Sequence, residues 1–371
     1  MTGPLAGVKV LDLSQIVSGP MAGAWLADQG ADVLKLESRE GDPVTGFGAR
    51  RGGLSAIYIA VNRGKRGEVL DLKDPAAHPR FEELLRWADV LIENFRPGTM
   101  ERLGFPYARA ADINPRLVWC AITGFGADGP YANLRAYDPV VQAASGVCAL
   151  QAEPDGTPRL VGTLIFDKVT AITAAQAITA ALFARERTGA GQKVEVAMLD
   201  AAIAFNWVEG MYNQAFVEGA EAPMPDYASF GRLWRAKDGW VSCSALQDVE
   251  FRALREALGH PESLADPAFD TGGGRFANLP RMMAAMAAEV GKRTTAELME
   301  GFIRAGAVGC VVNDRASVIA DPQVVHNGCL VEVAQGDSGA VRVARHPIRF
   351  SRTPAIARPA PAPRLRPLPG A

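Results

Sequence analysis

Short apolar runs alternate with amphipathic segments along the first two hundred residues of the chain. The runs have the length of buried strands, and the segments between them repeat their apolar positions with the period of a helix. Strands separated by helices predict a parallel sheet with crossover connections, an α/β fold. We predict strands over residues 8–13, 33–36, 90–92, 117–122 and 193–197, and helices over residues 21–28 and 81–87.

One helix is expected to differ from the others, because residues 169–184 form a run of 16 without any charge. A segment that is apolar on all sides predicts a buried helix, although three threonines and a glutamine leave it short of a membrane span. Gly189 and Gly191 are expected to end it. Asp167 precedes the run and has the position of an N-cap. Because a helix N-terminus also keeps a carboxylate ionised, Asp167 is a candidate nucleophile as well.

The pattern changes after residue 200. A short strand over residues 240–244, followed by helices in 248–258 and 279–304, predicts a smaller α+β domain at residues 225–315. Connectors at residues 201–224 and 316–329 flank this domain. The tail from Pro354 onward holds six prolines in eighteen residues, which predicts an extended segment lying on a surface.

Composition narrows the class of protein. The chain has 371 residues, 48% of them hydrophobic, and a net charge of −2 with both signs interspersed. This length supports a large core, and the lack of a basic stripe argues against nucleic-acid binding. The first residues lack the basic and apolar regions of a signal peptide. Five cysteines and four histidines are scattered without a CxxC pair, which indicates a reduced, intracellular protein without a metal site.

Two glycine-containing turns raise the question of a bound nucleotide. Residues 124–129, GFGADG, follow a predicted strand and match GxGxxG, but no helical pattern opens after them. The first turn, SQIVSGPMAG, lacks spaced glycines. We therefore expect a Rossmann-like fold without the dinucleotide fingerprint. The sequence also lacks the signatures of serine hydrolases, zinc proteases and P-loop enzymes.

Basic side chains recur in the loops of the first two hundred residues. Several lie at predicted strand ends, where ligands bind in open α/β sheets. Together they could hold a phosphorylated ligand, whereas singly each is a solvated surface charge, and spacing alone does not decide between the two. The residues are Arg39, Arg63, Lys65, Arg66, Lys73, Arg96, Arg102 and Arg135.

A succession of motifs runs through the chain: GVKVLDLS, GPMAGAWLADQGADVLKLE, NRGKRGEVLDLK, ADVLIENFRPGTMERLG, GFGADGPYANLRAYDPVVQAASG, the aspartate before the apolar helix, and TGAGQKVEVAMLDA. Their order resembles the class III CoA-transferases. This group includes formyl-CoA:oxalate, carnitine and bile-acid CoA-transferases and the α-methylacyl-CoA racemases. The resemblance is dense over residues 4–205 and thinner to residue 350.

The resemblance implies a fold and an assembly. Residues 1–200 together with 330–371 would form a large Rossmann-like, CoA-binding domain beside the smaller α+β domain. Two ring-shaped subunits would be threaded through each other as an interlocked homodimer, which accounts for the long connectors and the proline-rich tail. A subunit of this kind is not expected to be stable alone.

The resemblance also implies a reaction, in which CoA moves from an acyl-CoA donor to a carboxylic acid acceptor. Asp167 matches the family's catalytic aspartate, which forms an aspartyl anhydride and then an aspartyl-CoA thioester. Exchange of CoA between two carboxylic acids is nearly neutral in energy, but the anhydride must be shielded from water. Each tetrahedral intermediate also needs oxyanion donors, for which Gly146 and residues 242–247 are the candidates.

Positions that match the family's CoA contacts are spread over the first domain. Their cations would meet the 3′-phosphate and the pyrophosphate, and their apolar members would pack against adenine or pantetheine. CoA and acyl-CoA would be substrates, with no tightly bound cofactor, no metal, and neither nucleic acid nor a membrane as partner, in the cytoplasm. The matched residues are Val17, Ser18, Arg39, Leu70, Asp71, Leu72, Lys73, Asn94, Phe95, Arg96, Arg102, Arg135, Tyr137 and Asp138.

Three departures from the oxalate-type enzymes argue against oxalate as the acceptor. Val17 stands where those enzymes carry glutamine, and this points to a more apolar acid. Ser38 stands where a CoA-binding arginine is common, and Arg39 is the substitute. The glycine-rich loop of the oxalate-type enzymes is not evident around Ser244.

A racemase or epimerase is the alternative within the family, and it needs two bases to remove and return an α-proton. The racemases carry a histidine where this chain has Tyr137, and a glutamate near the position of Gln247. A tyrosine, with a pKa of about 10, is a poor base at neutral pH, so we favour a transferase. A non-catalytic CoA-binding protein is the alternative from another class, and the presence of Asp167 argues against it.

Overall fold

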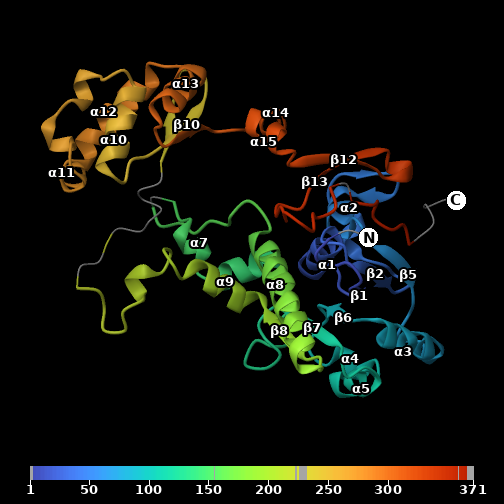
Figure 1. Cartoon of the computed structure of the whole chain (residues 1–371). Coiled ribbons are helices and arrows are strands. Elements are labelled where there is room, and N and C mark those ends of the chain that lie inside the picture. The colour runs from blue at the N-terminus through green and yellow to red at the C-terminus, as the bar shows by residue number, and fades with distance from the viewer. Residues whose placement is uncertain (1–2, 154, 222–223, 225–231, 358, 366–371) are drawn as a thin grey trace. The chain divides into compact units, whose positions relative to one another are not determined.

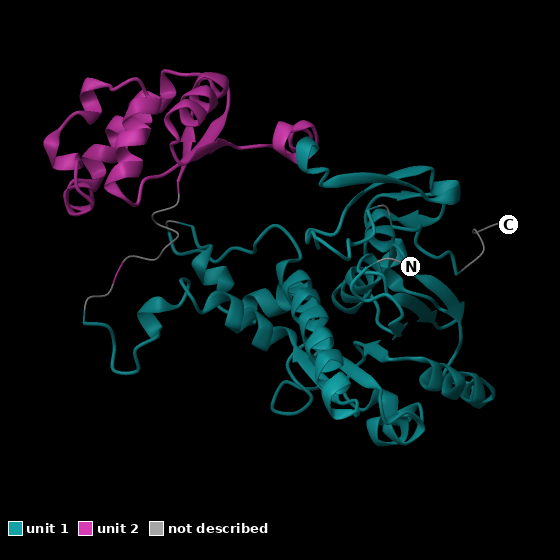
Figure 2. Ribbon diagram, viewed as in Figure 1, with its two compact units in different colours: residues 1–221, 325–371 teal, residues 222–324 magenta. Residues whose placement is uncertain are grey.

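The computed structural model describes residues 3–153, 155–221, 224, 232–357 and 359–365, in two compact units (Figure 2). The first unit comprises residues 1–221 and 325–371, and the second comprises residues 222–324. The chain thus leaves the first unit, builds the second and returns, so that both chain ends belong to the first unit (Figure 1).

A six-stranded parallel sheet forms the centre of the first unit and confirms the α/β class. Its strand order is β5-β2-β1-β6-β7-β8, and every neighbouring pair is parallel. Numbered within the sheet, this is the order 3-2-1-4-5-6 of doubly wound nucleotide-binding folds, whose winding reverses between the first and fourth strands. The strands are β1 Lys9–Asp12, β2 Asp32–Glu37, β5 Arg66–Val69, β6 Val90–Glu93, β7 Val118–Thr123 and β8 Lys193–Ala197.

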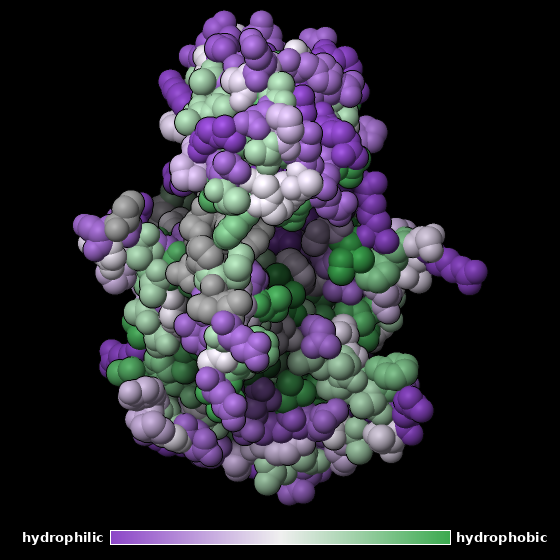
Figure 3. Space-filling view, turned by 90° about the vertical axis from the view of Figure 1, so that its left-hand side faces the viewer, coloured by the Kyte–Doolittle hydropathy of each residue, from purple (hydrophilic) through white to green (hydrophobic). Residues whose placement is uncertain are grey.

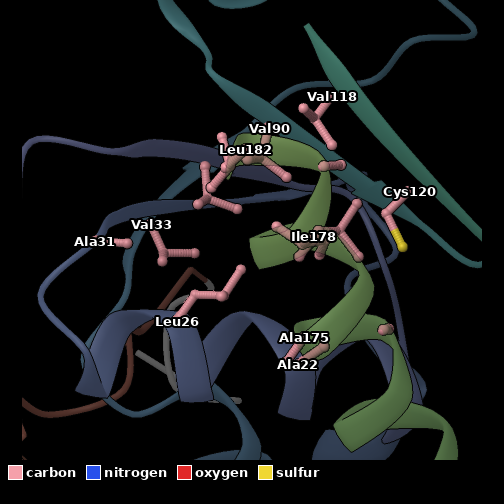
Figure 4. Packing of buried hydrophobic residues seen from close by; sticks show 14 of the residues in the cluster. Ala22, Leu26, Ala31, Val33, Val90, Val118, Cys120, Ala175, Ile178 and Leu182 are labelled. Atoms are coloured by element: carbon pink, nitrogen blue, oxygen red, sulfur yellow. The ribbon is translucent and has the colours of Figure 1, made fainter. Parts of the chain in front are cut away.

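Alternating side chains along these strands form a core on each face of the sheet. Val33 and Val90 pack with helices α1 (Ser18–Asp28) and α8 (Ile165–Thr188) on one face (Figure 4). Their neighbours Leu34 and Leu91 belong to the opposite core, with Phe81 of helix α3 (His78–Trp87). Because successive strand residues point to opposite faces, burial on both faces explains why the central strands β6 and β7 are nearly continuous apolar runs.

The remaining elements of the first unit connect the strands or follow the last of them. Short turns of 3-10 helix lie at Pro43–Gly46, Pro75–Ala77, Tyr212–Gln214 and Gly336–Ser338, and β3 (Arg50–Arg51) pairs with β4 (Leu54–Ser55). The helices are α1 Ser18–Asp28, α2 Ala56–Asn62, α3 His78–Trp87, α4 Thr99–Arg102, α5 Tyr107–Ile113, α6 Asp138–Ala144, α7 Val147–Leu150, α8 Ile165–Thr188 and α9 Met198–Asn206.

Helix α8 departs from its prediction in two respects. It begins at Ile165 with Leu164 as its N-cap, so Asp167 is the third residue of the helix and not the cap. It is also buried on one side only, since Ile172 and Phe183 are 46% and 66% exposed. By length and hydropathy the helix could cross a membrane, contrary to expectation, but half of its most apolar window is buried within the protein.

The returning C-terminal segment covers part of the first unit. Strands β12 (Leu330–Ala334) and β13 (Ala340–Ala344) form a hairpin that shares a core with Tyr58 of α2. The described part of the tail forms neither helix nor strand. Its residue Ala362 exchanges hydrogen bonds of 2.9 Å with the side chain of Gln335, so the tail is held against the hairpin.

The second unit is a small α+β domain. Its antiparallel sheet has the order β11-β10-β9, and helices pack around Trp234, Leu254 and Phe302. Two 3-10 turns lie at Glu262–Leu264 and Pro267–Phe269, and α15 (Pro322–Asn327) leads back to the first unit. The other elements are β9 Leu233–Arg235, β10 Trp240–Cys243, β11 Gly309–Val311, α10 Asp248–Ala257, α11 Gly272–Ala277, α12 Leu279–Gly291, α13 Thr295–Ala305 and α14 Ser317–Ala320.

Candidate active site

A cleft of about 220 Å³ opens at the carboxyl ends of β1, β6 and β7, beside the point where the winding of the sheet reverses. Open α/β sheets bind their ligands at this place. Asp167 is the one carboxylate among the described residues that line the cleft. The lining residues are Gln15, Ile16, Ser18, Asn94, Phe95, Arg96, Pro97, Ile122, Thr123, Gly124, Ala132, Leu134, Arg135, Ala136, Tyr137, Asp167 and Met198.

A second cleft of about 410 Å³ adjoins the first and shares Gln15 and Phe95 with it. It lies beyond the carboxyl ends of β2 and β5, and its lining includes the run of residues 70–73. The predicted residues Leu70, Leu72 and Lys73 are thus brought next to the cleft of Asp167. Two adjoining clefts along one edge of the sheet provide room for an elongated ligand.

Asp167 is only 8% exposed, and its environment changes the pKa of its carboxyl group. Burial raises its pKa to about 7, and the negative charge of Asp138 adds to the rise. The hydroxyl and backbone N–H of Ser18 act in the opposite direction by hydrogen bonding to the carboxylate. Since α1 begins at Ser18, the N-terminus of this helix meets the Asp167 carboxylate.

Asp138 lies beneath the start of α8 instead of in either cleft. Its side chain is fully buried and accepts hydrogen bonds from the backbone N–H groups of Phe166 at 2.6 Å and Asp167 at 3.1 Å. Gln142 donates to its other oxygen at 2.5 Å. Asp138 therefore supplies the acceptor that a capping side chain would otherwise supply, which explains why Asp167 is left free to face the cleft.

The loop between β1 and α1 approaches the sheet closely. Gln15 donates its N–H to the amide oxygen of Asn94 at 2.8 Å and accepts the amide N–H of Asn94 at 2.7 Å. A Cβ atom at Gly19 would lie 2.3 Å from the Cβ of Ser14, so the first turn of α1 requires glycine there. Asn94, predicted to contact CoA, lines the first cleft and also fixes this loop.

Two predicted arginines, Arg96 and Arg135, line the first cleft and are available for an anion. Within the described part of the chain, neither guanidinium takes part in an ion pair or hydrogen bond. Both side chains are exposed. Guanidinium groups bind phosphate oxygens in pairs, so this cleft suits a ligand with phosphate groups.

Three other basic residues form ion pairs within the protein. Both the surface-charge and the phosphate-binding interpretation are wrong for Arg63 and Lys65, which form buried ion pairs with aspartates. Arg66 forms a more exposed pair. The pairs are Arg63–Asp28 at 2.6 Å, Lys65–Asp12 at 2.7 Å and Arg66–Asp32 at 2.8 Å.

Several matched positions lie outside the lining of both clefts in the single chain. Arg39 is 75% exposed in its side chain and lies 4.0 Å from Asp74. Arg102 donates to the hydroxyl of Thr99 at 2.7 Å. Val17 is buried, and its neighbour Ile16 lines the cleft instead.

Some residues of the site were not indicated by the sequence. Ile16 and Met198 contribute apolar walls next to Asp167. Glu93, at the end of β6, lines neither cleft but holds Phe95, which lines both: its carboxylate accepts the N–H of Phe95 at 2.8 Å, and burial raises its pKa to about 7. The position of Glu93 at a strand end, and of Ile16 in the loop that follows β1, was the signal that could have revealed them.

The predicted oxyanion donors are not among the lining residues. Gly146 is the N-cap of α7, and residues 242–247 belong to the second unit. No histidine lines either of the two clefts. Among the residues that the structure describes, there is no group of three or more histidine, cysteine or acidic side chains that could hold a metal ion.

Comparison with known proteins places this chain in a family. The sequence model described as CoA-transferase family III matches residues 5–365. The acetyl-CoA:oxalate CoA-transferase of Acetobacter aceti is 36% identical over 357 residues, which cover 94% of this chain and 90% of that protein. The succinate–glutarate CoA-transferase of Agrobacterium fabrum is 34% identical over 365 residues, with 95% and 90% covered.

Solved structures agree with the sequence comparison. A CAIB/BAIF family protein from Brucella suis superposes with a TM-score of 0.85 at 32% identity, covering 98% of this chain and 97% of that one. Rv3272 from Mycobacterium tuberculosis gives 0.84 at 29% identity with the same coverage. The resemblance drawn from the motifs is thereby confirmed.

Proposed function

Because the chain belongs to CoA-transferase family III and is an enzyme of that class, we propose that it moves CoA from an acyl-CoA donor to a carboxylic acid acceptor with Asp167 as the nucleophile. One observation carries the proposal. Asp167 is the one carboxylate among the described residues that line the cleft at the switch point of the sheet. A carboxylate nucleophile needs such a partly dry cleft with room for a thioester.

The proposed reaction begins with attack of an Asp167 carboxylate oxygen on the thioester carbonyl. The C–S bond breaks, CoA leaves as a thiolate, and an acyl–aspartyl anhydride remains. The thiolate then attacks the aspartyl carbonyl, which releases the donor acid as a carboxylate and leaves an aspartyl-CoA thioester. The acceptor carboxylate repeats both steps in reverse, so bonds and charges balance over the cycle.

The environment of Asp167 suits this chemistry. With a pKa of about 7, the carboxyl is half ionised at neutral pH, and its ionised form is a stronger nucleophile than an ordinary aspartate. Ser18 lines the cleft beside Asp167, and its hydrogen bonding to the carboxylate favours the ionised form. The apolar side chains of Ile16, Ile122 and Met198 limit the access of water, which would hydrolyse the anhydride.

The CoA portion would occupy the two adjoining clefts. Arg96, Arg135 and Lys73 supply the cations for its phosphate groups. Leu70 and Leu72 supply apolar surface for adenine or pantetheine. Arg39 and Arg102, exposed at the edge of the site, remain proposed phosphate contacts, and CoA is a substrate and not a tightly bound cofactor.

The acceptor acid would carry an apolar chain, because Ile16, Ile122 and Met198 line the cleft together with Asp167. The relatives named above act, by their names, on acetyl-CoA and oxalate or on succinate and glutarate. Ile16 and Met198 offer no partner for a second carboxylate, whereas Arg96 and Arg135 would be engaged by CoA. We therefore propose a short aliphatic acid in preference to oxalate.

A homodimer, and specifically the interlocked one, is part of the proposal. The chain leaves the first unit at residue 222 and returns at residue 325, as a ring-shaped subunit would. Large apolar side chains are exposed on the single chain, and Figure 3 shows apolar surface on one of its faces. Phe183, Trp207, Val208 and Phe216 are between 45% and 77% exposed, which is typical of a surface that a partner covers.

The proposed location is the cytoplasm. All five cysteines are unpaired, which fits a reducing compartment.

An exchange assay tests the function. The protein would be mixed with acetyl-CoA or succinyl-CoA and a panel of acids that includes oxalate, succinate, glutarate and aliphatic acids, and new thioesters would be measured by chromatography. The proposal expects exchange for at least one pair and its loss in Asp167→Asn. Exchange of an α-proton for deuterium without CoA transfer would instead identify a racemase, and CoA binding alone a non-catalytic protein.

A further inference from the structure

Three side chains hold the main chain between β1 and α1. Asp12 accepts the N–H and the hydroxyl of Ser14, and Asn94 holds both the N–H and the carbonyl of Gln15. The N–H of Ile16 donates to the carboxylate of Asp42, at 3.1 Å and 3.2 Å from its two oxygens. Ser18, which contacts Asp167, follows two residues later.

Ile16 has an unusual backbone conformation. Its φ of +70° lies in the left-handed region, which a β-branched residue rarely adopts. Only one other non-glycine residue among those described, His260 of the second unit, has a positive φ. Such a conformation persists only where the surroundings enforce it, and Ile16 lines the cleft of Asp167.

Asp42 is itself fixed by a buried network. It forms an ion pair with Lys35 at 3.3 Å, and neither side chain is exposed. It also accepts the N–H of Val44 at 3.0 Å, while its own N–H donates to Glu37 at 3.3 Å. Lys35 donates in addition to the carbonyl of Ser14, so the network contacts the same loop twice. A buried ion pair adds little net stability, and its better-attested role is to specify one conformation.

We propose that Asp42 is a positioning residue for the Asp167 site. By holding the N–H of Ile16, it keeps the loop in the left-handed turn that places the first residue of α1 against the Asp167 carboxylate. The inference rests on the proposed function, because the acylation rate of Asp167 reports the effect of Asp42 on the loop only if Asp167 is the nucleophile. A role of Asp42 in stability alone would not act through Ile16.

A double-mutant cycle separates these roles. Glycine adopts a φ of +70° without strain, whereas alanine does not. Ile16→Gly and Ile16→Ala would therefore be made both in the wild type and with Asp42→Asn. The acylation rate of Asp167 would be followed by quenched-flow mass spectrometry, and CoA affinity by calorimetry. All variants would be compared by circular dichroism and thermal unfolding.

We expect Asp42→Asn to slow acylation by about 10- to 100-fold while CoA affinity changes by less than about threefold. With Asp42→Asn present, Ile16→Gly should acylate at least about tenfold faster than Ile16→Ala, although the two differ by less than about threefold in the wild type. Equal rates for glycine and alanine beside Asp42→Asn would overturn the proposal. If Asp42→Asn does not fold, Asp42→Glu replaces it in the cycle. Glutamate keeps the negative charge, but its longer side chain moves the carboxylate oxygens away from the N–H of Ile16.

Hydrogen exchange keeps this inference distinct from the proposed function. If the wild type forms no adduct at Asp167, the proposed function fails, and exchange in the peptide of residues 13–19 still tests the role of Asp42. Exchange of that peptide should be at least about tenfold faster in Asp42→Asn than in the matched control Asp32→Asn, whose carboxylate pairs with Arg66 away from the loop. Equal exchange in the two variants would contradict the proposal.

Discussion

Asp138 accepts the backbone N–H of Asp167 at 3.1 Å, and its negative charge raises the pKa of the Asp167 carboxyl above the value that burial alone would produce. One side chain therefore both anchors the start of α8 and tunes the residue that faces the cleft. The two carboxylates have separate roles because only Asp167 lines the cleft, whereas Asp138 is fully buried among hydrogen-bond donors.

The pH dependence of acylation should report this relationship. The carboxyl of Asp167 attacks in its ionised form, so the rate should rise with pH to a plateau, with a midpoint near pH 7 instead of near the usual 3.8. Single-turnover acylation, measured between pH 5 and 9, checks the midpoint. Asp138→Asn removes the nearby charge and should move the midpoint to lower pH by about one unit. A rate that is flat over this range in the wild type would contradict the account.

The contribution of Asp167 to the free energy of unfolding should fall as the pH rises, whereas the acylation rate should increase. A folded-state pKa raised above the unfolded one means that Asp167 contributes its full stability below about pH 4, and loses it as the pH rises through about 7. Asp167→Asn removes the buried charge and should therefore stabilise the protein by about 1–3 kcal/mol at pH 8, with little effect at pH 4. Chemical denaturation of both proteins at the two pH values makes the comparison. Equal stability at pH 8 would show that the carboxylate is not strained by its burial.

Much of the fold could be predicted from the sequence, since β1, β6 and β7 are short, mostly apolar runs that are almost fully buried. Strands β2 and β8 also contain charged residues, but their apolar residues were enough to predict them. Strand β5 was not, because Arg66–Val69 is a polar edge strand without any apolar run. The strand order also needed the structure, because spacing along the chain does not state which neighbours pair.

Only part of the candidate site could be predicted from the sequence. Asp167, Arg96 and Arg135 were identified through the resemblance, and the structure brings all three to one cleft. The connection between Asp42 and Ile16 joins residues 26 positions apart through a positive φ, which no periodicity reveals. The buried state of the Lys65 ammonium was equally hidden, because a lysine in a loop is most often solvated.

Lys65 and Arg66 should behave differently although they are neighbours. Lys65→Met leaves Asp12 without its buried partner and should destabilise the protein by about 3–5 kcal/mol, whereas loss of the exposed Arg66 pair in Arg66→Met should cost less than about 1 kcal/mol. Denaturation midpoints of both variants check this difference. If Lys65→Met were as stable as the wild type and bound CoA more weakly, Lys65 would be a ligand contact after all.

Arg96 and Arg135 should affect binding without affecting stability, because neither guanidinium has a partner within the described structure. Arg96→Met and Arg135→Met should each raise the KM for acyl-CoA by about tenfold or more, with an increase that diminishes at high salt. Arg159→Met is the matched control, since Arg159 forms an exposed pair with Glu153 away from either cleft. Equal KM values for the three variants would show that Arg96 and Arg135 do not contact acyl-CoA.

The most direct test of the central claim is mass spectrometry of the protein after incubation with a panel of acyl-CoAs, including succinyl-CoA, quenched with hydroxylamine or borohydride. Wild type and Asp167→Asn would be treated side by side, with Asp138→Asn as a variant that keeps the cleft carboxylate. The account predicts a modification located at Asp167 in the wild type and in Asp138→Asn, and none in Asp167→Asn. An adduct at another residue, or no adduct together with deuterium incorporation at an α-carbon, would contradict Asp167 as the nucleophile of a CoA transfer.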